Sequence, residues 1–102
     1  MQELTDQGFN SAIGDGVTLV CFSAAWCKPC AAFKVTLHQY AKTESAPPLF
    51  VADIDVCPLS ARAYGIKGVP SLVMFRDGVQ VASTGALPLA KLVQWVRDRG
   101  AK

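Results

Sequence analysis

Two cysteines separated by two residues are the feature of the chain whose type and spacing most clearly indicate chemistry. Cys27 and Cys30 lie in the segment Trp26-Cys27-Lys28-Pro29-Cys30. A β-rich apolar run, residues 17–22, precedes them, and apolar residues at helical spacing follow them. A disulfide between them can close across one helical turn. The spacing therefore indicates thiol–disulfide exchange, in which a thiolate attacks a disulfide and forms a mixed disulfide.

The expected strand-to-helix junction gives the two thiols different roles. Cys27 is expected at the helix N-terminus, where free N–H groups and the helix dipole favour an anion and lower a thiol pKa. Lys28 adds a positive charge beside it, and Pro29 is tolerated because the first N–H groups of a helix have no partner. Cys30 lies on the apolar stripe of the helix. We therefore predict an exposed attacking thiolate at Cys27 and a shielded resolving thiol at Cys30.

Three other interpretations of the pair remain open. A structural zinc site would need four ligands, and Cys21, Cys57 and His38 are the residues that could complete it. The pair could instead be purely structural, or it could belong to a binding module that holds a partner protein without exchange. We expect no metal and no cofactor, because a single cysteine pair is half a zinc site and Cys21 lies in an apolar run.

Other side chains that could react have inert alternatives. Cys21 is expected to be a small apolar core residue. Cys57 precedes Pro58 at an expected helix start. It is either an accessible thiol of low pKa or, as we favour, an inert turn residue. Asp53 and Asp55 end a strand and are expected to be solvated there rather than to bind metal.

Strand and helix patterns alternate along the chain in the order β-α-β-α-β-α-β-β-α. Alternating strands and helices favour parallel strand pairs, whereas the Arg76-Asp77-Gly78 hairpin turn adds an antiparallel pair. We predict one α/β domain, residues 1–102, with a central mixed sheet of four to five strands and helices on both faces. Strands are predicted over residues 17–22, 49–54, 71–75 and 79–83, and helices over 6–13 and 27–43, from Pro58 and from Pro88. The two long helices are expected to bury Cys30, Phe33, Leu37, Tyr40 and Ala41 in one case, and Leu89, Leu92, Val93 and Val96 in the other.

Composition and charge exclude several classes of protein. With 102 residues, 51% of them hydrophobic and 18% charged, the chain is not intrinsically disordered. Its net charge of +2 is too small to indicate nucleic acid or an anionic membrane as a partner. The longest mostly apolar stretch, residues 17–26, is shorter than the ~20 residues of a membrane span, and the N-terminus lacks the features of an export signal. We therefore expect a cytoplasmic protein, in a compartment that keeps thiols reduced.

Taken together, these motifs resemble the thioredoxins over nearly the whole chain. Their order and spacing are far more specific than the cysteine pair alone. The matching segments are residues 19–22, Ala25-Trp26-Cys27-Lys28-Pro29-Cys30, Ile54-Asp55, Tyr64-Gly65-Ile66-Lys67-Gly68-Val69-Pro70-Ser71, Phe75-Arg76-Asp77-Gly78 and Gly85-Ala86-Leu87.

The resemblance implies a thioredoxin fold and a protein-disulfide reductase whose redox-active disulfide is Cys27–Cys30. It implies disulfide-containing proteins as substrates and a reductase as the electron donor, and we expect a monomer. Pro70 would be a cis proline facing the cysteines, and Val69 would offer its backbone to a bound substrate segment. Ile54 and Val69 could equally be core residues. The substrate surface is expected to consist of Trp26, Lys28, Pro29, Ile54, Gly68, Val69, Pro70, Gly85 and Ala86.

Five positions depart from the family pattern. Cys21 stands where the family carries a buried Asp, thought to move the proton of the resolving cysteine, and Val51 stands where a Lys often accompanies it. Ser23, Val35 and Lys28 replace a Trp, a helix-kinking Pro and a Gly. We expect these changes to affect the rate, the pH profile and the redox potential rather than the fold.

Overall fold

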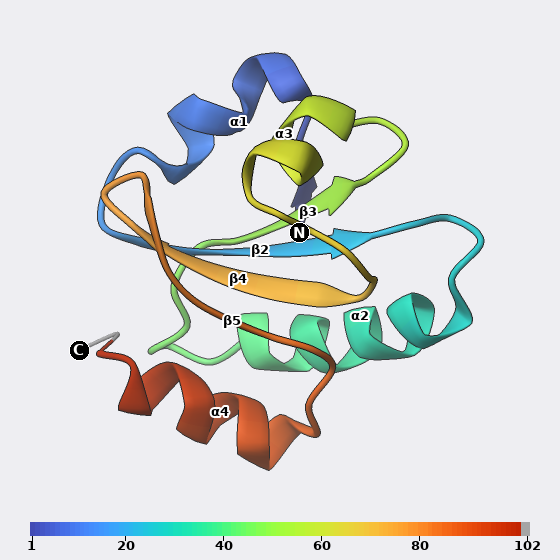
Figure 1. Cartoon of the computed structure of the whole chain (residues 1–102). Helices are drawn as coiled ribbons and strands as arrows, with labels where there is room; N and C mark the ends of the chain where they lie inside the picture. The colour runs from blue at the N-terminus through green and yellow to red at the C-terminus, as the bar shows by residue number, and fades with distance from the viewer. Residues whose placement is uncertain (101–102) are drawn as a thin grey trace.

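The computed structural model describes residues 1–100, which form a five-stranded mixed sheet with two helices on each face (Figure 1). The spatial order of the strands is β1-β3-β2-β4-β5, and both the order along the chain and the mixed sheet agree with the prediction. The strands are β1 (Gln2–Glu3), β2 (Val17–Ser23), β3 (Leu49–Asp53), β4 (Ser71–Arg76) and β5 (Val79–Thr84). The helices are α1 (Asp6–Ile13), α2 (Lys28–Ala41), α3 (Pro58–Ala63) and α4 (Leu89–Asp98).

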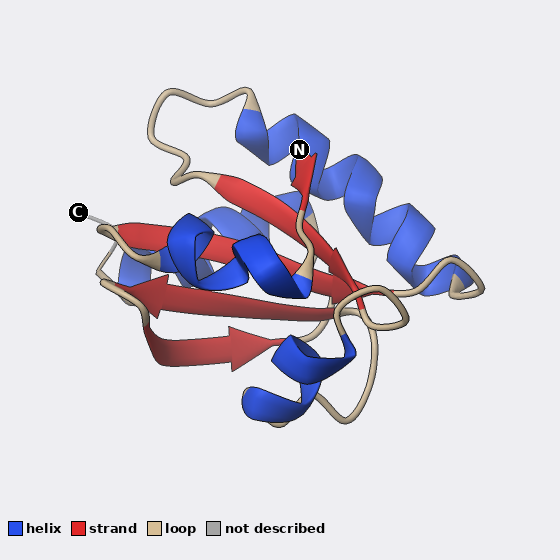
Figure 2. Ribbon diagram, turned by 90° about the horizontal axis from the view of Figure 1, so that it is seen from above, coloured by secondary structure: helices blue, strands red, loops and turns tan. Residues whose placement is uncertain are grey.

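Strand β2 occupies the centre of the sheet because it is apolar on both faces. It pairs in parallel with β3 and antiparallel with β4. Successive side chains of a strand point to opposite faces, so Leu19 and Cys21 pack in the core with α2 and α4. Val20 and Phe22 pack in the second core with α1 and α3. Figure 2 looks onto the sheet from the side of α1 and α3.

The two edges of the sheet differ in how well their sequence patterns predicted them. The β4–β5 hairpin turns at Asp77 and Gly78, whose φ angles of 50° and 84° are the positive values that the Asp-Gly pair predicts. The sequence pattern placed no residues in β1, because Gln2 and Glu3 are polar and exposed. They join the sheet only through backbone pairing with β3.

Some element bounds and buried positions differ from the predictions. Helix α2 begins at Lys28, with Cys27 as its N-cap, and ends at Ala41, which is exposed. Leu89 was expected on the buried face of α4 but is 37% exposed, because it is the first helical residue and precedes the stripe of Leu92 and Val96 that reaches the core. Within residues 1–100, none of the helices combines the length and the apolar character needed to cross a lipid bilayer.

Candidate active site

The end of β2 and the start of α2 bring the two cysteines together. The chain leaves β2 after Ser23 and turns, with the Cys27 N–H donating to the Ala24 carbonyl at 3.2 Å. Cys27 has the extended backbone of an N-cap residue, and its sulfur accepts the Cys30 N–H at 3.2 Å. A sulfur therefore occupies the place that a Ser or Asp oxygen takes at many helix starts. The predicted position of Cys27 at the helix N-terminus is confirmed.

The two cysteines are joined by a disulfide, with their Cα atoms 5.2 Å apart. Cys27 is 7% exposed and Cys30 is 1% exposed. Cys27 is the more accessible of the two, but the prediction of an exposed residue is wrong for this oxidised state, because Ala24, Ile54 and Val69 pack around the pair. Ile54 and Val69 are each half-buried and pack against the cysteines, so both are partly core residues, and their role in a substrate surface stays a prediction.

The segment before β4 approaches Cys27 from the other side. The Val69–Pro70 peptide bond is cis, as the resemblance implies. The Val69 carbonyl oxygen lies 3.8 Å from the Cys27 sulfur. The Val69 backbone is thus beside the Cys27 sulfur.

Trp26 is held at the site by a carboxylate that the sequence analysis did not assign to it. The Trp26 ring is 69% exposed, and its Nε1 donates to Oδ2 of Asp55 at 3.3 Å. The Asp55 N–H in turn donates to Oδ1 of Asp53 at 2.8 Å. The two carboxylates therefore order the loop after β3, and no cluster among the described residues could hold a metal ion. The signal available in the sequence was the expectation of parallel strand pairs, since the loops after two adjacent parallel strands lie at the same end of the sheet, and the structure pairs Ser23 of β2 with Asp53 of β3.

A groove of about 550 Å³ opens beside the cysteines, between Trp26 and the segment that joins α3 to β4. Four predicted site residues line it, namely Trp26, Ile54, Gly68 and Val69. Sequence patterns did not indicate the other lining residues, which are Pro58, Ala61, Arg62, Ile66 and Lys67.

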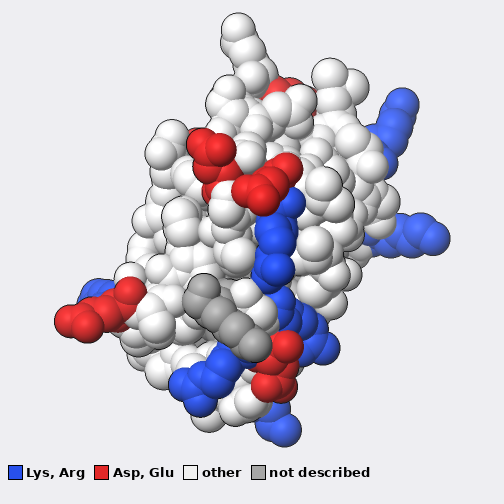
Figure 3. Space-filling model, turned by 90° about the vertical axis from the view of Figure 1, so that its left-hand side faces the viewer, with Lys and Arg blue, Asp and Glu red and all other residues white. Residues whose placement is uncertain are grey.

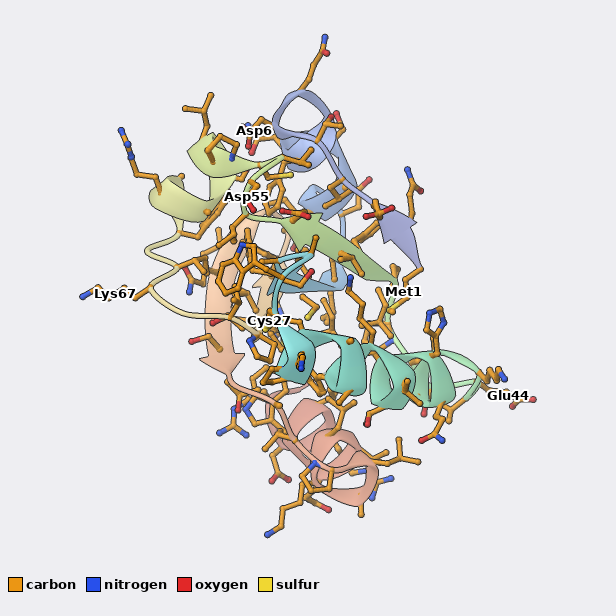
Figure 4. All side chains as sticks on the ribbon, turned by 90° about the vertical axis from the view of Figure 1, so that its right-hand side faces the viewer. Met1, Asp6, Cys27, Glu44, Asp55 and Lys67 are labelled. Atoms are coloured by element: carbon orange, nitrogen blue, oxygen red, sulfur yellow. A yellow bond between two sulfur atoms is a disulfide. The ribbon has the colours of Figure 1, made fainter. Side chains whose placement is uncertain are left out.

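The remaining predicted site residues lie outside this groove. Lys28 and Pro29 are exposed in the first turn of α2, next to Cys27, and Pro70 is half-buried after Val69. Gly85 and Ala86 are exposed in the connection after β5 and do not line the groove. Figure 4 shows the face of the molecule on which Cys27, Asp55 and Lys67 lie.

The start of α3, which carries one wall of the groove, is anchored by Asp6. Its carboxylate accepts hydrogen bonds from the Ser60 hydroxyl at 2.7 Å, the Ser60 N–H at 2.9 Å and the Leu59 N–H at 3.1 Å. Partial burial opposes ionisation of Asp6, but the hydrogen bonds from Ser60 and Leu59 outweigh it and hold the pKa of that carboxyl below its ordinary value. The groove wall thus depends on a residue more than 50 positions earlier in the chain.

The two other cysteines are buried, and neither has the surroundings of a reactive thiol. Cys21 is fully buried, and this burial raises the pKa of its thiol to about 12, although Lys34 partly offsets the effect. Cys57 is also fully buried, and its thiol donates to the Leu4 carbonyl at 3.1 Å. Burial and the carboxylates of Asp6 and Asp53 raise the pKa of Cys57. The alternative of an accessible, low-pKa thiol at Cys57 is wrong, and the interpretation of Cys21 as a core residue is confirmed.

Comparison with known proteins gives one family. The thioredoxin family model matches residues 1–98. The chain is 39% identical over 102 aligned residues to a thioredoxin of Rhodospirillum rubrum, with 94% of this chain and 96% of the relative covered. It is 37% identical over 97 residues to thioredoxin C-2 of Corynebacterium nephridii, with 90% and 89% covered. A solved structure of the Malassezia sympodialis thioredoxin Mala s 13 has a TM-score of 0.86 and 22% identity, with 97% of this chain and 90% of that chain covered, and this likeness concerns the fold alone.

Proposed function

The chain belongs to the thioredoxin family, and from that premise we propose that Cys27 attacks the disulfides of protein substrates and that Cys30 resolves the mixed disulfide. Membership of the family makes the chain a thiol–disulfide oxidoreductase that acts on disulfide-containing proteins and takes its electrons from a reductase. The roles of the individual residues are our assignment.

The position of the Cys27 sulfur at the helix N-cap is the observation that carries this assignment. In the reduced protein, the Cys30 N–H that donates to this sulfur at 3.2 Å stabilises a thiolate more than a thiol. The dipole of α2 acts in the same direction and so does the charge of Lys28, and we therefore assign Cys27 as the attacking thiolate. Cys30, at 1% exposed, is shielded from an approaching substrate.

The exchange proceeds in two substitutions at sulfur. The Cys27 thiolate attacks one sulfur of the substrate disulfide, so that a new S–S bond forms and the other substrate sulfur leaves as a thiolate. Cys30 then loses its proton and attacks the Cys27 sulfur, which closes the Cys27–Cys30 disulfide and releases the second substrate thiol. Two electrons pass from the protein dithiol to the substrate, and the reductase supplies two electrons to reopen the disulfide.

The substrate surface that we assign is centred on the groove beside Cys27. Trp26, Ile54, Gly68 and Val69 line it, and the Val69 carbonyl beside the Cys27 sulfur is placed to receive a hydrogen bond from an extended substrate segment. We assign the margins of this surface to five further residues, namely Lys28, Pro29, Pro70, Gly85 and Ala86.

The wider setting follows from this chemistry. We assign residues 1–102 to a single domain that acts as a monomer, a state in which the groove beside Cys27 stays open to substrates. A dithiol that must stay reduced suits the cytoplasm. The net charge of +2 favours neither nucleic acid nor an anionic membrane as a partner.

A trapping experiment tests the roles of the two cysteines. Reduced Cys30→Ser, incubated with a disulfide-bonded test protein, should accumulate a mixed disulfide that runs as one adduct without reductant and separates with it. Cys27→Ser is the matched control and should form little adduct. Equal trapping by the two variants would show that the attacking thiol has been assigned wrongly.

A further inference from the structure

The groove beside Cys27 has an apolar part and a cationic part. Trp26, Ile54 and Val69 give it apolar surface next to the cysteines, whereas Arg62 and Lys67 also line it. Both cations are exposed, and no carboxylate is among the lining residues. Figure 4 shows Lys67 on the same face as Cys27, with its side chain extended into solvent. On the opposite face, cationic and acidic side chains are interspersed (Figure 3).

The backbone holds both cations in place relative to Cys27. Arg62 lies on α3, and the chain reverses after it at Gly65, whose φ is 66°. The Ile66 N–H donates to the Ala61 carbonyl at 2.9 Å, which closes this reversal and returns the chain along the groove. Lys67 then precedes Val69 by two residues, a span of ~7 Å in extended chain. Lys67 therefore lies on ordered backbone two residues from Val69, and Arg62 lines the same groove from α3.

The two nearby acids keep their negative charge, but each accepts hydrogen bonds and neither is part of the groove lining. The Asp55 carboxylate accepts the Trp26 indole N–H, and the Asp6 carboxylate accepts the hydrogen bonds of Ser60 and Leu59. A bound segment would therefore meet apolar surface and positive charge there, and the partner that complements this surface is an extended peptide with negative side chains.

We propose that Arg62 and Lys67 make this groove select disulfide substrates that carry a carboxylate side chain within about two to four residues of the attacked cysteine. The proposal rests on the function proposed above and adds the class of substrate. The sulfur chemistry is unchanged, because the two cations contact the bound segment and not the reacting sulfurs.

Three peptide disulfides that differ in charge test whether the groove selects acidic substrates. Each substrate is a pair of identical peptides joined by one disulfide, with Glu, Gln or Lys at about two and three residues on both sides of the cysteine. The fully reduced protein is mixed with each substrate without other reductant, and the released thiol peptide is measured with time. One protein dithiol becomes a disulfide for each peptide disulfide that becomes two thiols. At low ionic strength the Glu peptides should react about 3-fold faster than the Gln peptides and about 10-fold faster than the Lys peptides.

Charge variants show whether these two residues cause the preference. Because rates are compared between peptides within one variant, a change in overall activity does not affect the ratio. The double variant Arg62→Glu with Lys67→Glu should reverse the order, and the double variant with Gln at both positions should bring the ratios near 1. About 0.5 M salt should also bring the rate ratios of the parent protein near 1. Lys42→Glu lowers the net charge by two, as the double Gln variant does, and is the matched control for that variant, because Lys42 caps the far end of α2, ~22 Å along the helix from Cys27. It should keep the order of the parent.

The outcomes separate this inference from the proposed function. A parent protein that reduces all three peptides at equal rates, or a double Glu variant that keeps the parental order, overturns the selection by Arg62 and Lys67 and leaves the reductase in place. A parent protein that reduces none of the peptides, and does not reduce a small neutral aromatic disulfide either, overturns the proposed function itself.

Discussion

Replacing Cys21 by aspartate is expected to destabilise the protein by an amount that depends strongly on pH. Cys21 is fully buried on β2, opposite Val51 of β3 and Leu72 of β4. Burial raises the pKa of its thiol from 9.0 to about 12, with a smaller opposing effect of Lys34. Because one pKa unit corresponds to ~1.4 kcal/mol, these surroundings disfavour an anion by ~4 kcal/mol.

The sign of the pH dependence follows from the direction of that effect. An aspartate has a pKa of ~3.9 in the unfolded chain, and the same cost would raise its folded pKa to ~7. The folded protein then holds the proton more tightly than the unfolded chain does, so the free energy of unfolding falls as pH rises from ~4 to ~7. Relative to a neutral side chain, the penalty should be near zero at about pH 3, ~1.5 kcal/mol at about pH 5 and ~4 kcal/mol above about pH 7.

Urea unfolding of the reduced protein between about pH 3 and 8.5 measures this penalty. Cys21→Asn is the matched control, because it has the size and polarity of aspartate but does not ionise. The difference in unfolding free energy between the two variants should follow the curve above. If Cys21→Asp fails to fold at neutral pH, the measurements at acid pH still test the prediction, since the unfolding free energies of the two variants should become equal there. A difference that stays flat within ~1 kcal/mol across the range would refute the reasoning, because it would mean that this strand position tolerates a carboxylate.

Three further predictions concern the same site and its supports. Cys21→Asp should resolve the mixed disulfide ~10-fold or more faster than Cys21→Asn near neutral pH in single-turnover kinetics, because a positioned general base is worth ~10²–10⁴ in rate. Equal rates would mean that another group already moves the proton of Cys30. Asp6→Ala should lower the urea midpoint at pH 7, and its difference from the parent protein should narrow as pH falls below about 3.8. A carboxyl whose pKa is held low stabilises the fold above its ordinary pKa and loses that effect as it becomes protonated. A difference in midpoint that does not depend on pH would contradict this role. Trp26→Phe keeps an aromatic ring but removes the N–H that Asp55 accepts, so KM for a protein disulfide should rise about 2- to 10-fold with kcat nearly unchanged, and a fall in kcat alone would argue against a role in binding.

The sequence could predict the parts of the fold that depend on local patterns of residues. The change from a continuous apolar strand to helical spacing located the junction at Cys27, and the Asp77-Gly78 pair identified the hairpin turn. The predicted order included a first strand, but no residues could be assigned to it, because Gln2 and Glu3 contribute only backbone to the sheet.

The parts of the site that sequence could not predict join residues far apart in the chain. The Trp26–Asp55 hydrogen bond spans 29 positions, and Asp6 reaches Ser60 across 54. Neither pairing leaves a periodicity in the sequence. The exposure of Cys27 was overestimated for the same reason, since Ile54 and Val69, which pack around it, arrive from other elements.

The hydrogen bond from the Cys30 amide to the Cys27 sulfur also makes the backbone a reporter of the redox state. The amide group does not titrate, but its resonance in a ¹⁵N-labelled protein responds to the charge on the atom that accepts its proton. A pH titration of the reduced protein, followed at the Cys30 amide, would therefore record the ionisation of Cys27 without any reagent that consumes the thiol. The same resonance would record closure of the disulfide, so that one nucleus in the first turn of α2 distinguishes thiol, thiolate and disulfide at the neighbouring sulfur.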